Sequence, residues 1–500
     1  MTDAPATGEP ASATVSRPLS DDEVARARTI LIARVLIGAY LAYVLLDLFR
    51  PRTVPNEPTL TIFWPQPPLP GMLGRMLSMS PAVFWTVLAG IVAGVVLQFP
   101  ATTARFAEGR RATVLTWVTL AVMLGPFALI PLTVIGSSPL AALACVPGSA
   151  FVLWLLYLFH WFPRLPIRML LAAFGWGALI MFGLGRAYNS LAVGTIIGFT
   201  TGTQAPGLGG LTGALYRMLS FFVLHMKIVS QLAAAAGVIL LLLWYRHRVT
   251  DAMTGLVLGA AVGLGYAFTE SVGFIQLADL LGGITGVTGG FEYWIRQSIG
   301  LVGGPVTFGA LLGAGLGLAA QARRRGQRVL IAGAGLLAAA GGAVGTELLS
   351  PWLFKLAAPH IEVGGPADTL LVSPFLWLLV QLPFIVLALM LLRNGACARA
   401  AAARAAVPEA VGEAITEREV PFLVDPALRL WAVASTWRRH GGHAALALSR
   451  LQSAQLDLAA WRWWQGARSD PNQAQKEGEK LHARVILLKS PSGAVPETTP

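Results

Sequence analysis

Residues 252–276 read AMTGLVLGAAVGLGYAFTESVGFIQ, an apolar run whose only charged side chain is Glu270. A helix needs about 20 apolar residues to cross the hydrocarbon core of a bilayer, because that core is ~30 Å thick and a helix rises 1.5 Å per residue. The run is long enough to cross. Its carboxylate must then face protein or water, because lipid does not solvate a charge.

The rest of the chain repeats this apolar pattern. Of its 500 residues, 55% are hydrophobic and only 12% are charged, whereas soluble domains carry about 25% charged residues. We expect spans at about residues 29–49, 81–100, 113–135, 139–161, 167–186, 217–245, 252–279, 297–320, 329–349 and 369–392. The sequence therefore predicts an all-α fold, a polytopic helical membrane protein of about ten transmembrane helices with a small helical cytoplasmic tail.

Arginines in alternate connections indicate the orientation. They precede the first span and follow each even-numbered span, as in residues 323–328, which read RRRGQR. Basic loops remain in the cytoplasm, so we expect a multi-pass protein of the cell membrane with both termini cytoplasmic. These loops account for the net charge of +12, so membrane lipids are expected partners and nucleic acid is not. Two cysteines are too few for a disulfide framework.

Composition divides the chain into four parts. We expect a disordered tail over residues 1–25, a transmembrane domain over 26–393, a cytoplasmic helical extension over 394–465 and a disordered tail over 466–500. Within the extension, leucines recur at approximately helical spacing over residues 444–464. That helix is expected either to pack on a neighbouring helix or to lie on the membrane surface.

Five ionisable residues are expected at one level of the membrane. Glu270 and Glu347 each lie 18 residues beyond the start of their span, about 27 Å along a helix and near the non-cytoplasmic side. His225, Lys227 and Arg296 fall in the same layer. Such groups either pair and snorkel toward the interface, or line a functional site. If they form a site, they should converge on one water-accessible cavity.

Residues 244–275, WYRHRVTDAMTGLVLGAAVGLGYAFTESVGFI, resemble the glutamate-bearing core of the PrsW family of intramembrane proteases, within the CAAX-protease-like superfamily. Gly265, Tyr266, Ala267 and Glu270 match the family's Gly-aromatic-Ala step and glutamate. The next span is similar in its opening Arg296 and its closing glycines. The resemblance covers about residues 217–350 as the core, together with 410–460, and it implies a bacterial membrane protein with peptide-hydrolase relatives.

The chain departs from the family where the catalytic groups should lie. The span before Glu270 lacks the family's paired glutamates and holds His225, Lys227 and Gln231 instead. The histidines expected in the next two spans are absent. If Ala343 stands at the second of them, Glu347 takes the acidic or amide position one turn later. Most of the family's catalytic set is therefore missing.

Three functions remain open on this basis. The first is a catalytically degenerate relative that binds a membrane protein or peptide. The second is an active protease with a rearranged site, in which Glu270, Glu347 and His225 are the candidate catalytic residues and Lys227 and Arg296 bind substrate. Since peptide hydrolysis needs a base or a metal to activate water, these three could also hold a divalent metal such as zinc; no other cofactor is indicated. The third function is a transporter.

Overall fold

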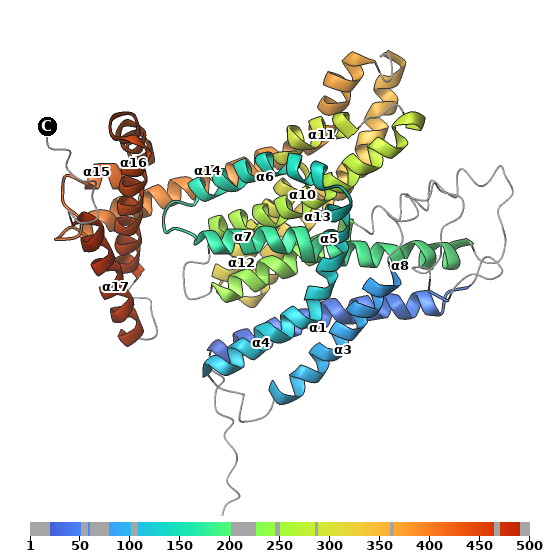
Figure 1. Ribbon diagram of the computed structural model, residues 1–500, viewed down its shortest axis with the longest axis horizontal. Helices are drawn as coiled ribbons and strands as arrows, with labels where there is room; N and C mark the ends of the chain where they lie inside the picture. Colours follow the sequence, from blue (N-terminus) through green and yellow to red (C-terminus); the bar gives the residue numbers. More distant parts are fainter. Residues whose placement is uncertain are drawn as a thin grey trace, which may run out of the picture.

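The computed structural model describes residues 21–51, 59–60, 80–101, 109–201, 227–245, 251–285, 289–360, 365–464 and 471–490. These residues form helices and short connections without a strand (Figure 1). Ten helices within the described ranges are long and apolar enough to cross a membrane. The expected all-α polytopic fold is therefore confirmed. His225, one of the candidate residues, lies outside the described ranges.

The helices have the following bounds. In chain order they are α1 (Asp21–Leu48), α3 (Pro81–Ala101), α4 (Gly109–Leu124), α5 (Leu129–Ser137), α6 (Pro139–Phe159), α7 (Ile167–Gly175), α8 (Phe182–Thr201), the span Lys227–Trp244, α10 (Ala252–Thr285), α11 (Gly289–Gln297), α12 (Gly304–Gln321), α13 (Arg325–Ala357), α14 (Ser373–Glu409), α15 (Val420–Val424), α16 (Pro426–Trp464) and α17 (Pro471–Lys489). Exposed leucine, valine and tryptophan side chains cover much of α3, α6 and α14, as expected for lipid-facing surfaces.

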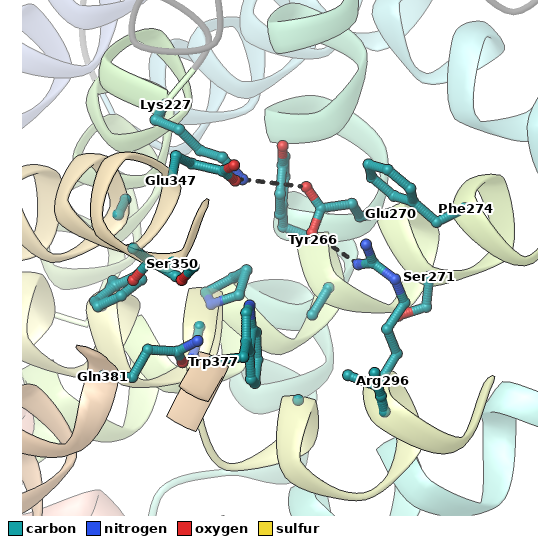
Figure 2. Close-up of a pocket in the computed structure, with 18 of the residues that line it drawn as sticks. Lys227, Tyr266, Glu270, Ser271, Phe274, Arg296, Glu347, Ser350, Trp377 and Gln381 are labelled. Carbon is teal, nitrogen blue, oxygen red and sulfur yellow. Dashed lines mark hydrogen bonds and ion pairs between the residues drawn. The ribbon is translucent and has the colours of Figure 1, made fainter. Parts of the chain in front are cut away.

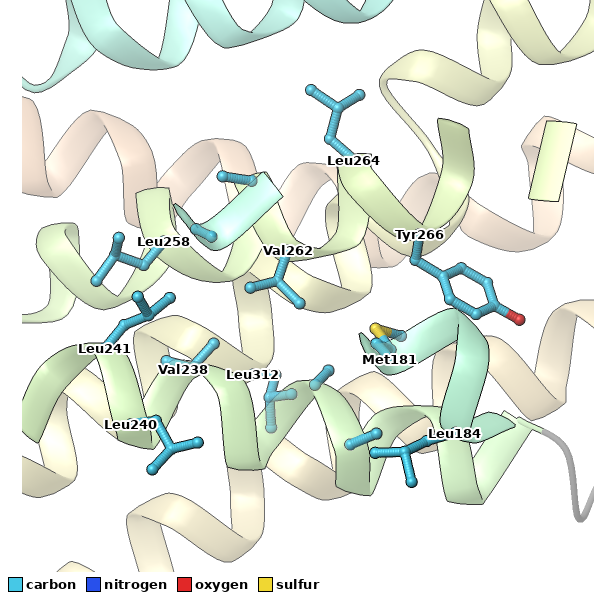
Figure 3. Close-up of a cluster of buried hydrophobic side chains, with 14 of the residues drawn as sticks. Met181, Leu184, Val238, Leu240, Leu241, Leu258, Val262, Leu264, Tyr266 and Leu312 are labelled. Carbon is cyan, nitrogen blue, oxygen red and sulfur yellow. The ribbon is translucent and has the colours of Figure 1, made fainter. Parts of the chain in front are cut away.

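Helix α10 lies at the centre of the membrane part. Its leucine and valine side chains are buried against α8, the span Lys227–Trp244 and α12 (Figure 3). Against α12 the two backbones touch, and a Cβ added at Gly259 would lie 2.0 Å from the carbonyl oxygen of Gly309. Small residues permit this close approach between membrane helices. The glycines of the opening sequence thus fix the position of the helix that carries Glu270.

The C-terminal bundle consists of α15, α16, α17 and the end of α14, at the left of Figure 1. The second half of α16 packs on its neighbours, with Leu456 and Leu458 fully buried. Of the two arrangements expected for this segment, the structure shows packing on neighbouring helices. The expectation of disorder over residues 466–500 was wrong for 471–489, which form α17. Val485 is fully buried in the bundle, and this tertiary contact stabilises a helix whose polar composition concealed it.

Arg399 joins this bundle to the membrane part. From α14, its guanidinium donates two hydrogen bonds of 2.8 and 2.9 Å to the Asp251 carboxylate at the start of α10. It also donates to the backbone oxygen of Phe162, at 2.6 Å, and to the hydroxyl of Thr254, at 3.1 Å. Both bonds come from Nη2, so one nitrogen of Arg399 spans the two oxygens of Asp251, and a hydrogen bond between two charged groups is stronger than a neutral one. We call Arg399 and Asp251, with the groups around them, the Arg399 clamp.

His160 belongs to the same clamp. Its Nδ1 lies 3.4 Å from Arg399 and its Nε2 lies 3.2 Å from the Thr254 hydroxyl. Because arginine can only donate, Nδ1 accepts, and the neutral ring donates from Nε2. Burial, followed by the positive charge of Arg399, holds the pKa of His160 well below its usual value.

This arrangement predicts a loss of stability in mild acid. The ring binds a proton near pH 6.5 in the unfolded chain, whereas burial opposes protonation in the folded chain. The free energy of unfolding is therefore highest above that pH, and below it decreases by up to about 1.4 kcal/mol per pH unit. We expect the melting temperature to drop between pH 7.5 and 5.5. His160→Gln should flatten this dependence, whereas His443→Gln, at an exposed position, should preserve it. An equal slope in both variants would contradict the assignment.

Candidate functional site

A cavity of about 430 Å³ opens where α10, α11, α12, α13 and α14 meet the span Lys227–Trp244 (Figure 2). Four of the five ionisable residues expected at one level line it: Lys227, Glu270, Arg296 and Glu347. They come from four separate helices. The structure thus brings these four together.

Lys227 lies between the two carboxylates. Its Nζ is 3.0 Å from Oε1 of Glu347 and 3.6 Å from Oε1 of Glu270. The Glu270 side chain is 11% exposed and that of Glu347 is 40% exposed. An ammonium group this close compensates the negative charges of both acids and offsets their removal from water. One cation therefore serves two carboxylates from different helices.

Arg296 holds the other oxygen of Glu270. Its Nη1 is 3.5 Å from Glu270 Oε2, and its Nε donates at 2.8 Å to Glu292, one turn earlier on α11. The guanidinium also lies 3.9 Å from the centre of the Phe274 ring, within cation–π range. Both oxygens of Glu270 thus face cations. Sequence analysis did not select Glu292, although a pair four residues apart on a helix is a recognisable signal.

Helix α14 supplies the opposite wall, with Trp377 and Gln381 (Figure 2). Gln381 is fully buried, and its Oε1 accepts from the backbone N–H of Gly304, where α12 begins with a positive φ of 54°. We did not anticipate this wall. Its sequence signal was a lone amide within the apolar run LLVQLPF of the tenth span, because a buried polar group in a membrane requires a partner.

Three buried polar atoms that line the cavity make no hydrogen bond within the described structure. They are Oε1 of Gln231, Oγ of Ser350 and Nε2 of Gln381. Gln231 is 4% exposed. Leaving a buried donor or acceptor unpaired costs about 1–3 kcal/mol. These three atoms lie beneath the surface of the cavity wall, so a bound molecule can pair with them only when their side chains turn toward the cavity.

These donors do not fit a divalent metal. A catalytic zinc site needs about three protein ligands, and no group of three or more His, Cys, Asp or Glu side chains that could hold a metal occurs in the described ranges. Glu270 and Glu347 already share the Lys227 ammonium. A metal ion bridging Glu270 and Glu347 would have to displace that positive charge.

The comparisons with known proteins found one family. Residues 165–342 match the model of the PrsW family, described as intramembrane metalloproteases. The match begins earlier than the expected core of 217–350, and it contains Lys227, Glu270 and Arg296 but stops before Glu347. Comparison with curated proteins and with solved structures found no match. Residues 165–342 are therefore similar to the PrsW family, within a membrane protein of many apolar helices.

Proposed function

We propose that this protein binds an extended segment of a membrane protein or peptide in the cavity and does not hydrolyse it. The observation that carries this proposal is the position of Lys227, whose ammonium lies within 3.6 Å of both Glu270 and Glu347. Hydrolysis needs a base or a metal to activate water. Here a tethered cation occupies the place where either would act.

Glu270 is poorly suited to act as a base. Its two oxygens lie 3.6 Å from Lys227 and 3.5 Å from Arg296. A general base must come within hydrogen-bond reach of the water that it deprotonates, and here a cation lies beside each oxygen of the carboxylate. The same contacts make it a rigid anchor, because side chains from two other helices hold its orientation.

The unpaired amides support a polypeptide as the occupant. In a membrane, the backbone of an extended segment has N–H and C=O groups that lipid cannot satisfy. When their side chains turn toward the cavity, Gln231 Oε1 can accept from such an N–H, and Gln381 Nε2 can donate to such a C=O. Trp377 and Phe274 add apolar area on two sides of the cavity. One donor, one acceptor and aromatic walls match the needs of a short unwound segment.

An active protease is the second candidate. It is favoured by the family description and by the presence of Glu270 and Glu347 in one cavity. In that case Glu270 would have to exchange a cation for water when substrate enters, and His225 would supply a further group.

The orientation expected from the basic loops belongs to the proposal. With both termini in the cytoplasm of a bacterial cell, the C-terminal bundle is cytoplasmic and the cavity lies toward the opposite surface.

A photo-crosslinker at Leu376 tests the function. Leu376 lines the cavity. Leu371 lies in the helical turn directly before α14, and its side chain is 70% exposed, so it provides a lipid-facing control. In native membranes we expect a discrete polypeptide adduct at position 376 and none at 371. Mass spectrometry should find that polypeptide equally long with the wild-type chain and with Glu270→Gln.

Two outcomes would reject the proposal. A partner that is shortened by the wild-type chain but intact with Glu270→Gln would establish the protease. Absence of any polypeptide adduct at position 376 would exclude a peptide occupant.

A further inference from the structure

We infer that the Arg399 clamp sets the shape of the cavity from the other end of α10 and α14. Arg399 is thus a positioning residue for a site that it does not touch. The inference rests on the proposed function only in treating the cavity as a binding site. Helices α10 and α14 meet at the clamp at one end and line the same cavity at the other.

Each of the two helices runs unbroken from the clamp to the cavity (Figure 1). On α10, Glu270 lies 19 residues after Asp251; on α14, Gln381 lies 18 residues before Arg399. At 1.5 Å per residue these separations are about 28 and 27 Å. The antiparallel helices therefore place their cavity residues at matching distances from the clamp.

Close contacts accompany the shared clamp. Helices α10 and α14 pack on each other, and one turn from Arg399 a Cβ at Gly395 would lie 2.9 Å from the sulfur of Met253. At the cavity, Gln381 bonds Gly304, whose helix α12 is packed backbone to backbone on α10. An axial shift of α14 at the clamp must therefore move Gln381 relative to Glu270. Pro383 can bend α14 but does not change the length of helix between the two points.

The C-terminal bundle controls this clamp. Ala403, Ala406 and Val407, one to two turns beyond Arg399 on α14, are buried in the bundle's apolar cluster together with Phe162. Arg399 donates to the backbone oxygen of that same Phe162. A molecule that loosens or tightens the bundle acts on the Arg399–Asp251 pair, and through α14 on the cavity. A change in the packing of the bundle would thus regulate the shape of the cavity.

Cysteine labelling at Ser350 tests this inference. The Ser350 hydroxyl is buried in the cavity wall, and the native thiols would be removed by Cys145→Ala and Cys397→Ser. In the full chain in nanodiscs, with Ser350→Cys as the reporter, we expect Arg399→Gln to raise the labelling rate by a water-soluble thiosulfonate about tenfold. Arg399→Lys keeps the charge, but one ammonium cannot replace the two guanidinium nitrogens that bind Phe162 and Asp251, so it should give an intermediate rate.

Two further variants make the result decisive. Gly395→Val separates α14 from α10 without removing a charge, and should also raise labelling. Arg34→Gln removes the 2.9 Å hydrogen bond to Gln98 between α1 and α3, away from the clamp and the bundle, and should leave the rate within twofold of wild type. An unchanged rate in folded Arg399→Gln or folded Gly395→Val, as judged by gel filtration, would overturn the inference. Labelling needs no bound peptide, so this result is independent of the test of function.

Discussion

Replacing Lys227 with glutamine is expected to destabilise the protein by about 2–3 kcal/mol. The substitution leaves Glu270 and Glu347 without the ammonium that lies 3.6 and 3.0 Å from them. Breaking a buried ion pair costs about 3–5 kcal/mol; Glu347 is 40% exposed, and water reduces the penalty there. The measurement is the melting temperature of the purified protein in detergent.

A divalent cation should restore part of that loss. Once the ammonium is gone, two carboxylates face a space from which they can ligate manganese or calcium. A ligand present at 100 times its dissociation constant adds about 2.7 kcal/mol. We therefore expect manganese to raise the melting temperature of Lys227→Gln and to leave the wild-type protein unchanged.

The double variant Lys227→Gln/Glu347→Gln is the control. It removes one of the two acids along with the cation, so it should recover stability without any response to manganese. Equal stabilisation of the wild-type protein by manganese would show that Lys227 does not exclude a metal, and the argument against metal-assisted hydrolysis would fail.

Adding one methyl group at Gly259 is expected to prevent folding. In Gly259→Ala the new Cβ would lie 2.0 Å from the carbonyl oxygen of Gly309, an atom of the helix backbone that no rotamer change can move. The two helices must separate along their length, and the cost should exceed the 1–3 kcal/mol typical of overpacking by side chains alone. We expect little or no monodisperse protein after extraction into detergent.

Gly333→Ala provides the matched control. No atom lies within 4 Å of a Cβ at that position on α13, and alanine is favoured over glycine in a helix by up to about 1 kcal/mol. This variant should be recovered at the wild-type level with an equal or higher melting temperature. Similar recovery of Gly259→Ala would mean that α10 and α12 are not packed backbone to backbone.

The local chemistry of the sequence was sufficient to predict the all-α membrane fold. Apolar runs such as 252–276 must become helices in lipid, because every backbone polar group has to be satisfied within its own segment. Counting residues along those runs also predicted the common depth of Glu270 and Glu347, because the rise per residue of a helix is fixed. The matching level of Lys227 and Arg296 follows from the same count.

The depth of a residue along a helix does not determine the direction in which its side chain points from the helix axis. Only the tertiary structure decided that direction. Packing rotates α10 and α13 so that Glu270 and Glu347 meet over Lys227, and it brings in the distant Gln381 as the facing wall. It also makes a helix of residues 471–489, whose polar sequence favours disorder until Val485 is buried. The sequence by itself determined that the chain has these apolar spans, and it predicted the depths of their ionisable residues. Which helices are neighbours depends on contacts between residues far apart in the chain, because the fit of their surfaces, and not their local composition, sets the packing.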